Sequence, residues 1–132
     1  MSKFKNSVIN VIRQVPYGMV ASYGQIALFV GTPRAAIQVG QVLHHYGADP
    51  KSKEENFPWW RIINNAGRIS IKGHPVNNAD MQKTLLVKEN ITVNDDLTLD
   101  IEKYRWRPDM EIIETFSLDD EYIEAIVRKY LL

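Results

Sequence analysis

The residues of greatest chemical interest form the segment Pro58-Trp59-Trp60-Arg61, in a chain of 132 residues that contains no cysteine. The lack of cysteine excludes a thiolate nucleophile, disulfides and thiolate metal sites. An indole ring donates only one hydrogen bond and has no lone pair with which to attack an electrophile. It does offer a broad face on which a nucleobase can stack. The segment therefore favours non-covalent binding over covalent catalysis.

Other arrangements that could support catalysis or hold a cofactor are weak. The pair His44-His45 suggests a metal, but adjacent helical positions point about 100° apart, and no Asp or Glu stands at ligand spacing. The sequence shows no glycine-rich phosphate loop, no Ser/His/Asp order and no convincing carboxylate pair. We expect neither a metal nor another cofactor.

The composition is that of one ordinary globular domain, with 45% hydrophobic and 24% charged residues. The apolar stretches are too short to span a membrane. The first residues lack the apolar region of a secretory signal, so we expect an intracellular protein, with the nucleus and the cytoplasm equally open.

The charge is divided unevenly, although the net formal charge is zero. Residues 1–107 contain 14 basic and 9 acidic residues, whereas residues 108–132 contain 2 basic and 7 acidic ones. A basic body with an acidic tail is compatible with nucleic-acid binding that the tail opposes. It is equally compatible with a solvated acidic helix that has no partner.

Three helices are expected in the first third of the chain. Apolar residues from Phe4 to Val15 recur at helical spacing. A short helix follows from about Tyr23 to Val30, led by Ser22. After a glycine, Thr32-Pro33 predicts a capped start for a third helix that runs to about residue 45. Two short helices joined by a tight glycine turn are typical of a helix-turn-helix.

The rest of the chain predicts smaller elements. We expect a polar loop over residues 47–56, a β-hairpin of residues 59–63 and 68–71 around a four-residue turn, a helix from about 78 to 90, a short strand at 97–99, and a C-terminal helix that begins at Ser117. Tyr122, Ile126 and Tyr130 share one stripe of the last helix, which predicts docking on the body or on a partner.

The order of motifs resembles the C-terminal, DNA-binding domain of O6-alkylguanine-DNA alkyltransferases, and more narrowly the cysteine-free alkyltransferase-like proteins. The resemblance covers about residues 4–108. It rests on the runs 15–27, 31–36 and 38–42, the Pro-Trp-Trp-Arg segment, residues 63–70, and the closing Tyr104-Arg105-Trp106-Arg107-Pro108.

The resemblance implies binding of duplex DNA through the minor groove, with the second helix of the helix-turn-helix as the recognition element. It implies rotation of an O6-alkylguanine out of the base stack into a pocket, without alkyl transfer. It also implies handover to nucleotide excision repair. We therefore expect a non-enzyme whose partners are double-stranded DNA with alkylated guanine and excision-repair proteins, and which acts as a monomer.

The same resemblance assigns a lesion pocket to Trp59, Ile62 and Lys72. Trp59 occupies the position of the family's reactive cysteine, where it would stack on the flipped base. Its alternative role is that of an ordinary core tryptophan. Lys72 stands where alkyltransferase-like proteins carry an arginine, and lacks that residue's planar fork. A surface lysine without a ligand is the alternative for Lys72.

Tyr23 matches the tyrosine that drives nucleotide rotation by crowding a phosphate, and Ser22 either caps the helix or donates to a phosphate. Ile37 replaces the family's arginine finger. It could wedge between base steps, but it cannot bond to the orphaned base. Arg34, Gln38 and Gln41 share its helix face and could reach phosphate, sugar or base edges; a solvent-exposed helix that no longer binds DNA is the alternative.

Two further positions match catalytic residues of the true enzymes. Trp60 replaces a histidine that would act on the thiol, and Glu89 matches the carboxylate that orients this histidine. Without a thiol, we expect Trp60 and Glu89 to be structural, with an acceptor for the Trp60 indole N–H. Arg61 is expected to brace the structure.

The sequence thus predicts a mostly α-helical α/β fold: a winged helix-turn-helix domain at residues 1–108 with a short β-hairpin, followed by an acidic extension at 109–132 with an extra helix. The expected function is non-catalytic recognition of O6-alkylguanine in duplex DNA. The alternative function is a protein-interaction module of the same fold that has lost DNA binding, in agreement with Ile37 and the acidic extension.

Overall fold

The computed structural model describes residues 2–69 and 78–132. The helices and strands follow one another as α1 (Lys3–Arg13), β1 (Ala21–Ser22), α2 (Tyr23–Phe29), α3 (Ala36–Gly47), α4 (Pro50–Glu54), the 3₁₀ turn η1 (Trp59–Arg61), β2 (Ile62–Ile63), α5 (Ala79–Lys88), α6 (Ile101–Tyr104), α7 (Met110–Glu114), α8 (Asp120–Ile126) and the π-helical turn η2 (Val127–Leu131). The expected mostly helical α/β fold is confirmed. Within the described residues, no helix is long and apolar enough to cross a membrane.

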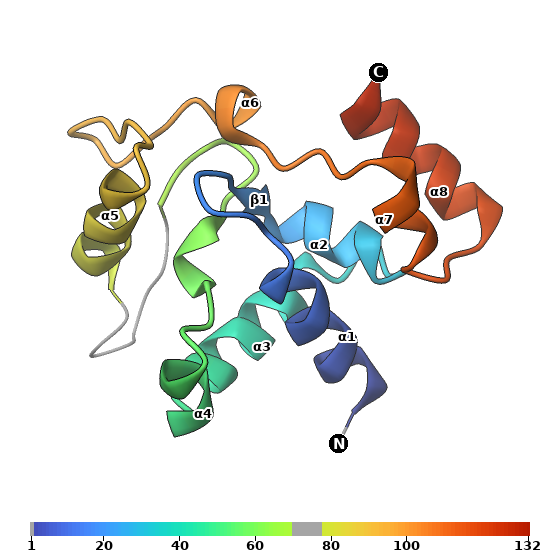
Figure 1. The fold of residues 1–132 in the computed structure, drawn as a ribbon, viewed down its shortest axis with the longest axis horizontal. Helices are drawn as coiled ribbons and strands as arrows, with labels where there is room; N and C mark the ends of the chain where they lie inside the picture. Colours follow the sequence, from blue (N-terminus) through green and yellow to red (C-terminus); the bar gives the residue numbers. More distant parts are fainter. Residues whose placement is uncertain (1, 70–77) are drawn as a thin grey trace.

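The helices α1, α2 and α3 pack against one another at the centre of the molecule. Helix α5 lies at one end of the molecule, and α7 and α8 lie beside α2 at the other (Figure 1). The core contains apolar side chains from all of these regions. Its completely enclosed members include Ile12, Ile26, Phe29, Ile62, Leu86, Ile113 and Ile126.

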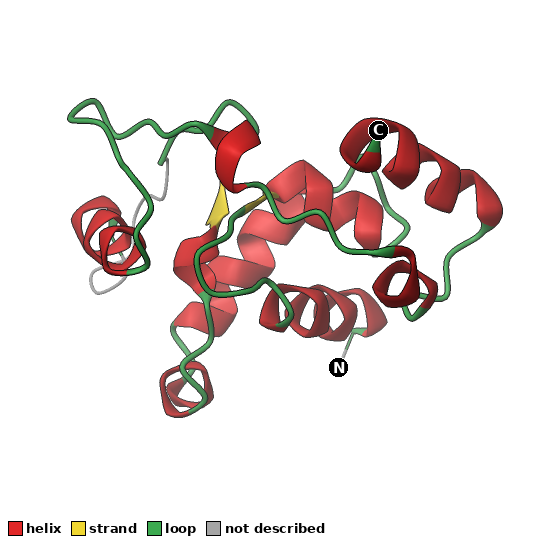
Figure 2. Ribbon diagram, turned by 45° about the horizontal axis from the view of Figure 1, so that its top comes forward, coloured by secondary structure: helices red, strands yellow, loops and turns green. Residues whose placement is uncertain are grey.

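The strands β1 and β2 form a parallel pair between the helices, with Ala21 opposite Ile62 and Ser22 opposite Ile63 (Figure 2). The expected β-hairpin is not found among the described residues, and residues 70–71 of its second strand lie outside them. Residues 59–61 form a 3₁₀ turn instead of a strand, and Arg68 bridges to Thr98. The turn between them exists, since the Asn64 N–H donates to the Arg68 carbonyl. The side-chain amide of Gln82 holds the 3₁₀ turn in place, because it donates 3.0 Å hydrogen bonds to both the Trp60 and Ile62 carbonyls.

The third helix also begins later than Thr32-Pro33 predicts. Thr32 does not cap the third helix, because its N–H and its hydroxyl both donate to the Ala27 carbonyl at the end of α2. The chain then makes another turn, in which the Ala35 N–H donates to the Thr32 carbonyl, and α3 starts at Ala36. By contrast, the starts of α2 and α5 follow the sequence: Ser22 caps α2 as expected, and α5 begins directly after Asn78, which caps it.

Two further expectations needed correction. The polar loop contains the short helix α4, which Asp49 caps with Pro50 at its first position. The C-terminal helix begins at Asp120 rather than at Ser117, because Ser117 adopts a left-handed conformation (φ 56°) that no helix start can use.

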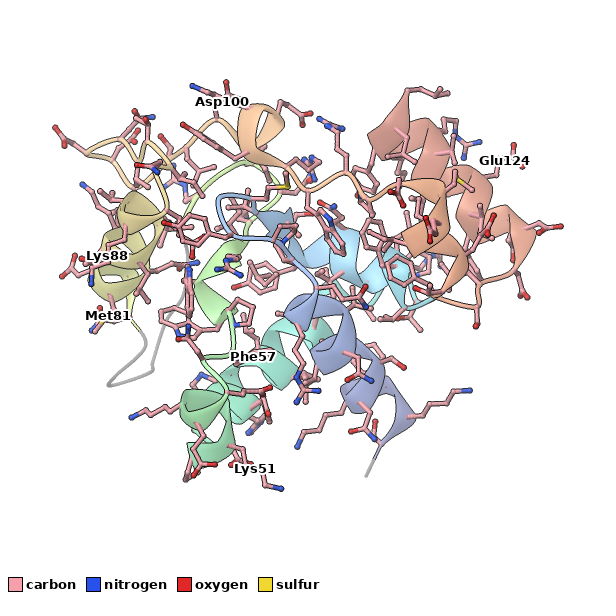
Figure 3. The ribbon with its side chains drawn as sticks, in the orientation of Figure 1. Lys51, Phe57, Met81, Lys88, Asp100 and Glu124 are labelled. Carbon is pink, nitrogen blue, oxygen red and sulfur yellow. The ribbon has the colours of Figure 1, made fainter. Side chains whose placement is uncertain are left out.

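The C-terminal extension, residues 109–132, packs against the body through Phe29. The Phe29 ring stacks on Phe116 at 5.3 Å between centroids and meets the edge of Tyr130 at 6.0 Å. Ile113 of α7 and Ile126 of α8 are fully enclosed. The acidic residues of the extension face away from this contact, as with Glu124 at the outer edge of the molecule (Figure 3).

Candidate nucleic-acid interface

A groove of about 580 Å³ lies where the start of α2 faces α3. Tyr23 and Ile37, two residues that the sequence assigns to one site, both line it. Ile37 is 76% exposed, which is unusual for a large apolar side chain and leaves it free to contact a ligand. The other lining residues are Gly24, Leu28, Pro33, Ala36, Gly40, Leu43, His44, Asn64, Asn65, Lys129 and Tyr130.

The start of α2 is fixed by a capping box. The Ser22 hydroxyl accepts from the Gln25 N–H at 3.0 Å, and the Gln25 side chain accepts from the Ser22 N–H. Ser22 is completely buried, so its place in this conformation is that of a cap rather than a surface donor. Tyr23 follows it, half-buried, and burial raises the pKa of its hydroxyl. Tyr23 therefore remains a neutral hydrogen-bond donor at physiological pH.

Helix α3 presents the face that the spacing predicts. Ile37, Gln38 and Gln41 are exposed, whereas Val39 and Leu43 are buried against the body. Arg34 is also exposed, but it lies in the turn before α3. This turn and the exposed face of α3 together offer one cation, two amides and an apolar tip.

The residues expected to form a lesion pocket are placed differently. Trp59 is 7% exposed and lines a separate cleft of about 190 Å³ together with Phe57, Met81 and residues of α4. Figure 3 shows Phe57 above α4 and Met81 on α5, the two elements that contribute to the lining of this cleft. Ile62 is completely enclosed in β2. Lys72 lies outside the described residues.

Trp59 is held in place by its neighbour. The Trp59 and Trp60 rings meet edge to face, with centroids 6.1 Å apart and planes at 89°. The Trp60 indole N–H in turn donates to Glu89 Oε2 at 2.7 Å. The expectation of an acceptor for this N–H is confirmed, and the acceptor is the carboxylate that the sequence reserved for a structural role.

Glu89 is the centre of a closed polar cluster, which we call the Glu89 cluster: Glu89, Trp60, Arg61 and the Gly18 N–H. The Arg61 guanidinium donates to both carboxylate oxygens, with Nη2 2.8 Å from Oε2, and also to the Val15 carbonyl at 3.0 Å. The Gly18 N–H donates to Oε1 at 2.8 Å. Arg61 is thus a structural brace, as expected.

The electrostatics of this cluster suit a permanently charged carboxylate. Burial opposes ionisation of Glu89, but the hydrogen bonds from Arg61, Gly18 and Trp60 outweigh it and lower the pKa of the carboxyl below its ordinary value. Glu89 is therefore ionised at neutral pH. With its donors all supplied by the protein, it has little capacity to act as a general base.

Several residues of the groove could not be assigned from the sequence. Asn64 and Asn65 read as turn residues only, yet both line the groove. Asn65 is oriented by Arg105 Nη2, 3.4 Å from its side-chain oxygen. Lys129 and Tyr130 come from the C-terminal extension, and the apolar stripe that includes Tyr130 was the only sequence signal for their approach.

The described residues contain no group of three His, Asp or Glu side chains that could hold a metal ion. The groove therefore offers hydrogen-bond donors, an exposed apolar tip and a lysine, all suited to a polar, extended ligand. It offers no thiol, since the chain contains no cysteine.

The sequence and fold are similar to those of characterised proteins. Residues 3–91 match the family described as 6-O-methylguanine DNA methyltransferase, DNA binding domain. The chain is 38% identical over 108 residues to a DNA base-flipping protein of Vibrio parahaemolyticus, covering 82% of this chain and all of that protein. It is 33% identical over 112 residues to alkyltransferase-like protein 1 of Schizosaccharomyces pombe, covering 82% of this chain and 98% of that protein.

The crystal structure of S. pombe Atl1 in complex with damaged DNA containing O6-carboxymethylguanine is similar in fold. The TM-score is 0.71 at 34% sequence identity, and the similarity covers 82% of this chain and 98% of that chain.

Proposed function

Since this chain belongs to the 6-O-methylguanine DNA methyltransferase DNA-binding family and, lacking cysteine, to its alkyltransferase-like proteins, we propose that it recognises O6-alkylguanine in duplex DNA without transferring the alkyl group. The relatives support this directly: one is a DNA base-flipping protein, and another forms a complex with damaged DNA. The chain spans these relatives almost completely.

The observation that carries the proposal of binding without alkyl transfer is the set of hydrogen bonds in the Glu89 cluster. A carboxylate that would support a catalytic histidine in the enzymes here accepts from an indole, a guanidinium and a backbone N–H instead. No thiol exists for it to activate. The chain thus keeps the fold of the enzymes, while Glu89 and Trp60 form structural hydrogen bonds in place of a catalytic site.

The groove, the exposed face of α3 and the turn before α3 together supply the proposed DNA contacts. Tyr23 crowds the backbone and drives rotation of the lesion nucleotide, and Ile37 fills the vacated space in the stack. Arg34 pairs with a phosphate, and Gln38 and Gln41 touch sugar or base edges. Ser22 acts through the cap that fixes the start of α2. Residues 1–108 are the proposed DNA-binding domain.

The proposed lesion pocket includes Trp59, whose indole stacks on the flipped base, a contact worth about 1–3 kcal/mol in comparable sites. Ile62 supports this pocket from the core, and Lys72 remains its predicted polar member. Flipping itself costs a few kcal/mol, and less at a badly paired base, which favours damaged sites. The complex would then mark damage for nucleotide excision repair, at an intracellular location where DNA is present.

A binding titration tests this function. Two matched duplexes, one with a single O6-methylguanine and one unmodified, are titrated with the full chain at two salt concentrations. Preferential binding to the modified duplex that weakens with salt is expected. Absence of binding to either duplex at micromolar protein would contradict the proposal and favour the protein-interaction module, for which the exposed Ile37 offers a contact.

A further inference from the structure

The DNA-facing groove is poor in positive charge. Replacement of the family's arginine finger by Ile37 leaves an apolar tip at the point where a cation would enter. Among the described residues that line the groove, Lys129 is the only lysine or arginine. If this groove binds a polyanion, its lysine is supplied by the C-terminal extension, which lies outside the helix-turn-helix.

Lys129 is well placed to use that charge. Its side chain is exposed, and it forms no ion pair with any described residue. Its neighbour Arg128 differs from Lys129 in two ways. Arg128 does not line the groove, and its guanidinium lies 3.7 Å from the Glu124 carboxylate on α8. Two adjacent cations of the extension therefore have different surroundings.

The backbone around Lys129 is anchored from several sides. Arg107 Nη1 donates to the Tyr130 carbonyl at 2.6 Å, and the Arg105 guanidinium lies 5.1 Å from the centroid of the Tyr130 ring. The Tyr130 ring also packs edge to face against Phe29. Burial raises the pKa of Tyr130, whose hydroxyl faces Ser22 at the start of α2. The end of the extension is thus fixed beside Tyr23 instead of trailing in solvent.

We propose that the C-terminal extension completes the DNA-binding groove, with the Lys129 ammonium pairing with a phosphate of the strand that lies against Tyr23, and with Tyr130 as the residue that positions it. This inference rests on the proposed function. It assigns the extension a direct part in binding and makes Lys129 a partial replacement for the charge missing at Ile37. The acidic residues of the extension are exposed, and Glu124 lies at the outer edge of the molecule (Figure 3).

The variant Lys129→Gln tests the proposal in the full chain, with Arg128→Gln as the matched control. Both remove one positive charge from adjacent positions, so any general electrostatic effect is the same. For Lys129→Gln we expect about three- to tenfold weaker binding to the O6-methylguanine duplex at low salt. The slope of log K against log [salt] should decrease by about 0.9, the value for one lost phosphate contact.

Two further readouts sharpen the test. Because a phosphate contact carries no sequence information, Lys129→Gln should weaken binding to the modified and unmodified duplexes by the same factor. Lys129→Arg should retain the wild-type salt slope, since it keeps the charge. Arg128→Gln should stay within about twofold of wild type.

The outcomes separate this inference from the proposed function. Wild-type protein that binds neither duplex would overturn both. Wild-type protein that prefers the modified duplex, together with equal affinities and slopes for Lys129→Gln and Arg128→Gln, would overturn only the part assigned to Lys129. Tighter binding by Lys129→Gln would also overturn it.

Discussion

The Glu89 cluster and the groove differ in how their polar groups are satisfied. In the cluster, one carboxylate accepts from Arg61, Trp60 and Gly18, and each donor comes from the protein itself. In the groove, Ile37 is exposed and Lys129 has no ion-pair partner among the described residues, and beside it the amides of α3 are exposed as well. The comparison teaches that the Glu89 carboxylate serves the fold, whereas the groove and the exposed face of α3 keep side chains available to a ligand.

The first way to break this comparison is Glu89→Gln, which carries the largest expected effect. It leaves the Arg61 guanidinium without its charge partner in a largely buried site, and we expect the free energy of unfolding to fall by about 3–5 kcal/mol. Chemical denaturation measures the loss. Glu124→Gln is the control, because its exposed pair with Arg128 should contribute less than about 1 kcal/mol.

Affinity completes this test. Under conditions where the Glu89→Gln protein is fully folded, its binding to the modified duplex should equal that of wild type within about twofold. A large loss of affinity at unchanged stability would mean that the cluster takes part in binding, contrary to the division described above.

The groove side of the comparison is tested by Ile37→Arg. A guanidinium at this exposed position can bond to the base left unpaired, so binding should tighten by about 1–3 kcal/mol, or about 5- to 150-fold. Gln38→Arg on the same face adds the same charge and is the control for simple attraction to phosphate. No response to Ile37→Arg would favour the interaction module over the lesion binder.

Acid should weaken the cluster selectively. The pKa of Glu89 is lower in the folded protein than its ordinary value of 4.5, so its stabilising contribution is complete above about pH 4.5 and is lost as the pH falls toward the folded value. Each unit of that difference corresponds to about 1.4 kcal/mol. The gap in unfolding free energy between wild type and Glu89→Gln should therefore shrink between pH 7 and pH 3.5. A constant gap would show that Glu89 does not titrate in this range.

The smallest effect is expected for Ile37→Ser on stability. Because the side chain is 76% exposed, its removal should change the unfolding free energy by less than about 0.5 kcal/mol. A thermal or denaturant melt measures this, and a loss above 2 kcal/mol would mean that Ile37 is a packing residue in solution. The same variant should weaken DNA binding if the wedge role is correct.

The sequence was sufficient where the determinants are local. The Ser22 cap, the start of α5 near Asn78 and the exposed face of α3 each depend on residues within a few positions of one another. It was sufficient for the structural role of Glu89 as well, because the lack of cysteine removes the alternative.

The sequence was insufficient where distant segments decide. Thr32 has the residue type of a helix cap, but its N–H and hydroxyl donate to the Ala27 carbonyl instead. Ile62 looked like part of a hairpin, whereas it pairs in parallel with Ala21. The approach of Lys129 to Tyr23 depends on the docking of the whole extension on Phe29, and no local pattern encodes that distance.

The long-range contacts behind the groove have a consequence for the order in which the protein acquires its native state. The Gln25 side chain donates to the Trp106 carbonyl, 81 residues later, and the Trp106 N–H donates back to Val20. In a chain emerging from the ribosome, α1 and α2 are thus available long before the segment that covers them. Such pairing slows folding and prolongs exposure of apolar surface. Val20, which is fully enclosed in the finished protein, gains its Trp106 partner only when the last third of the chain has been made.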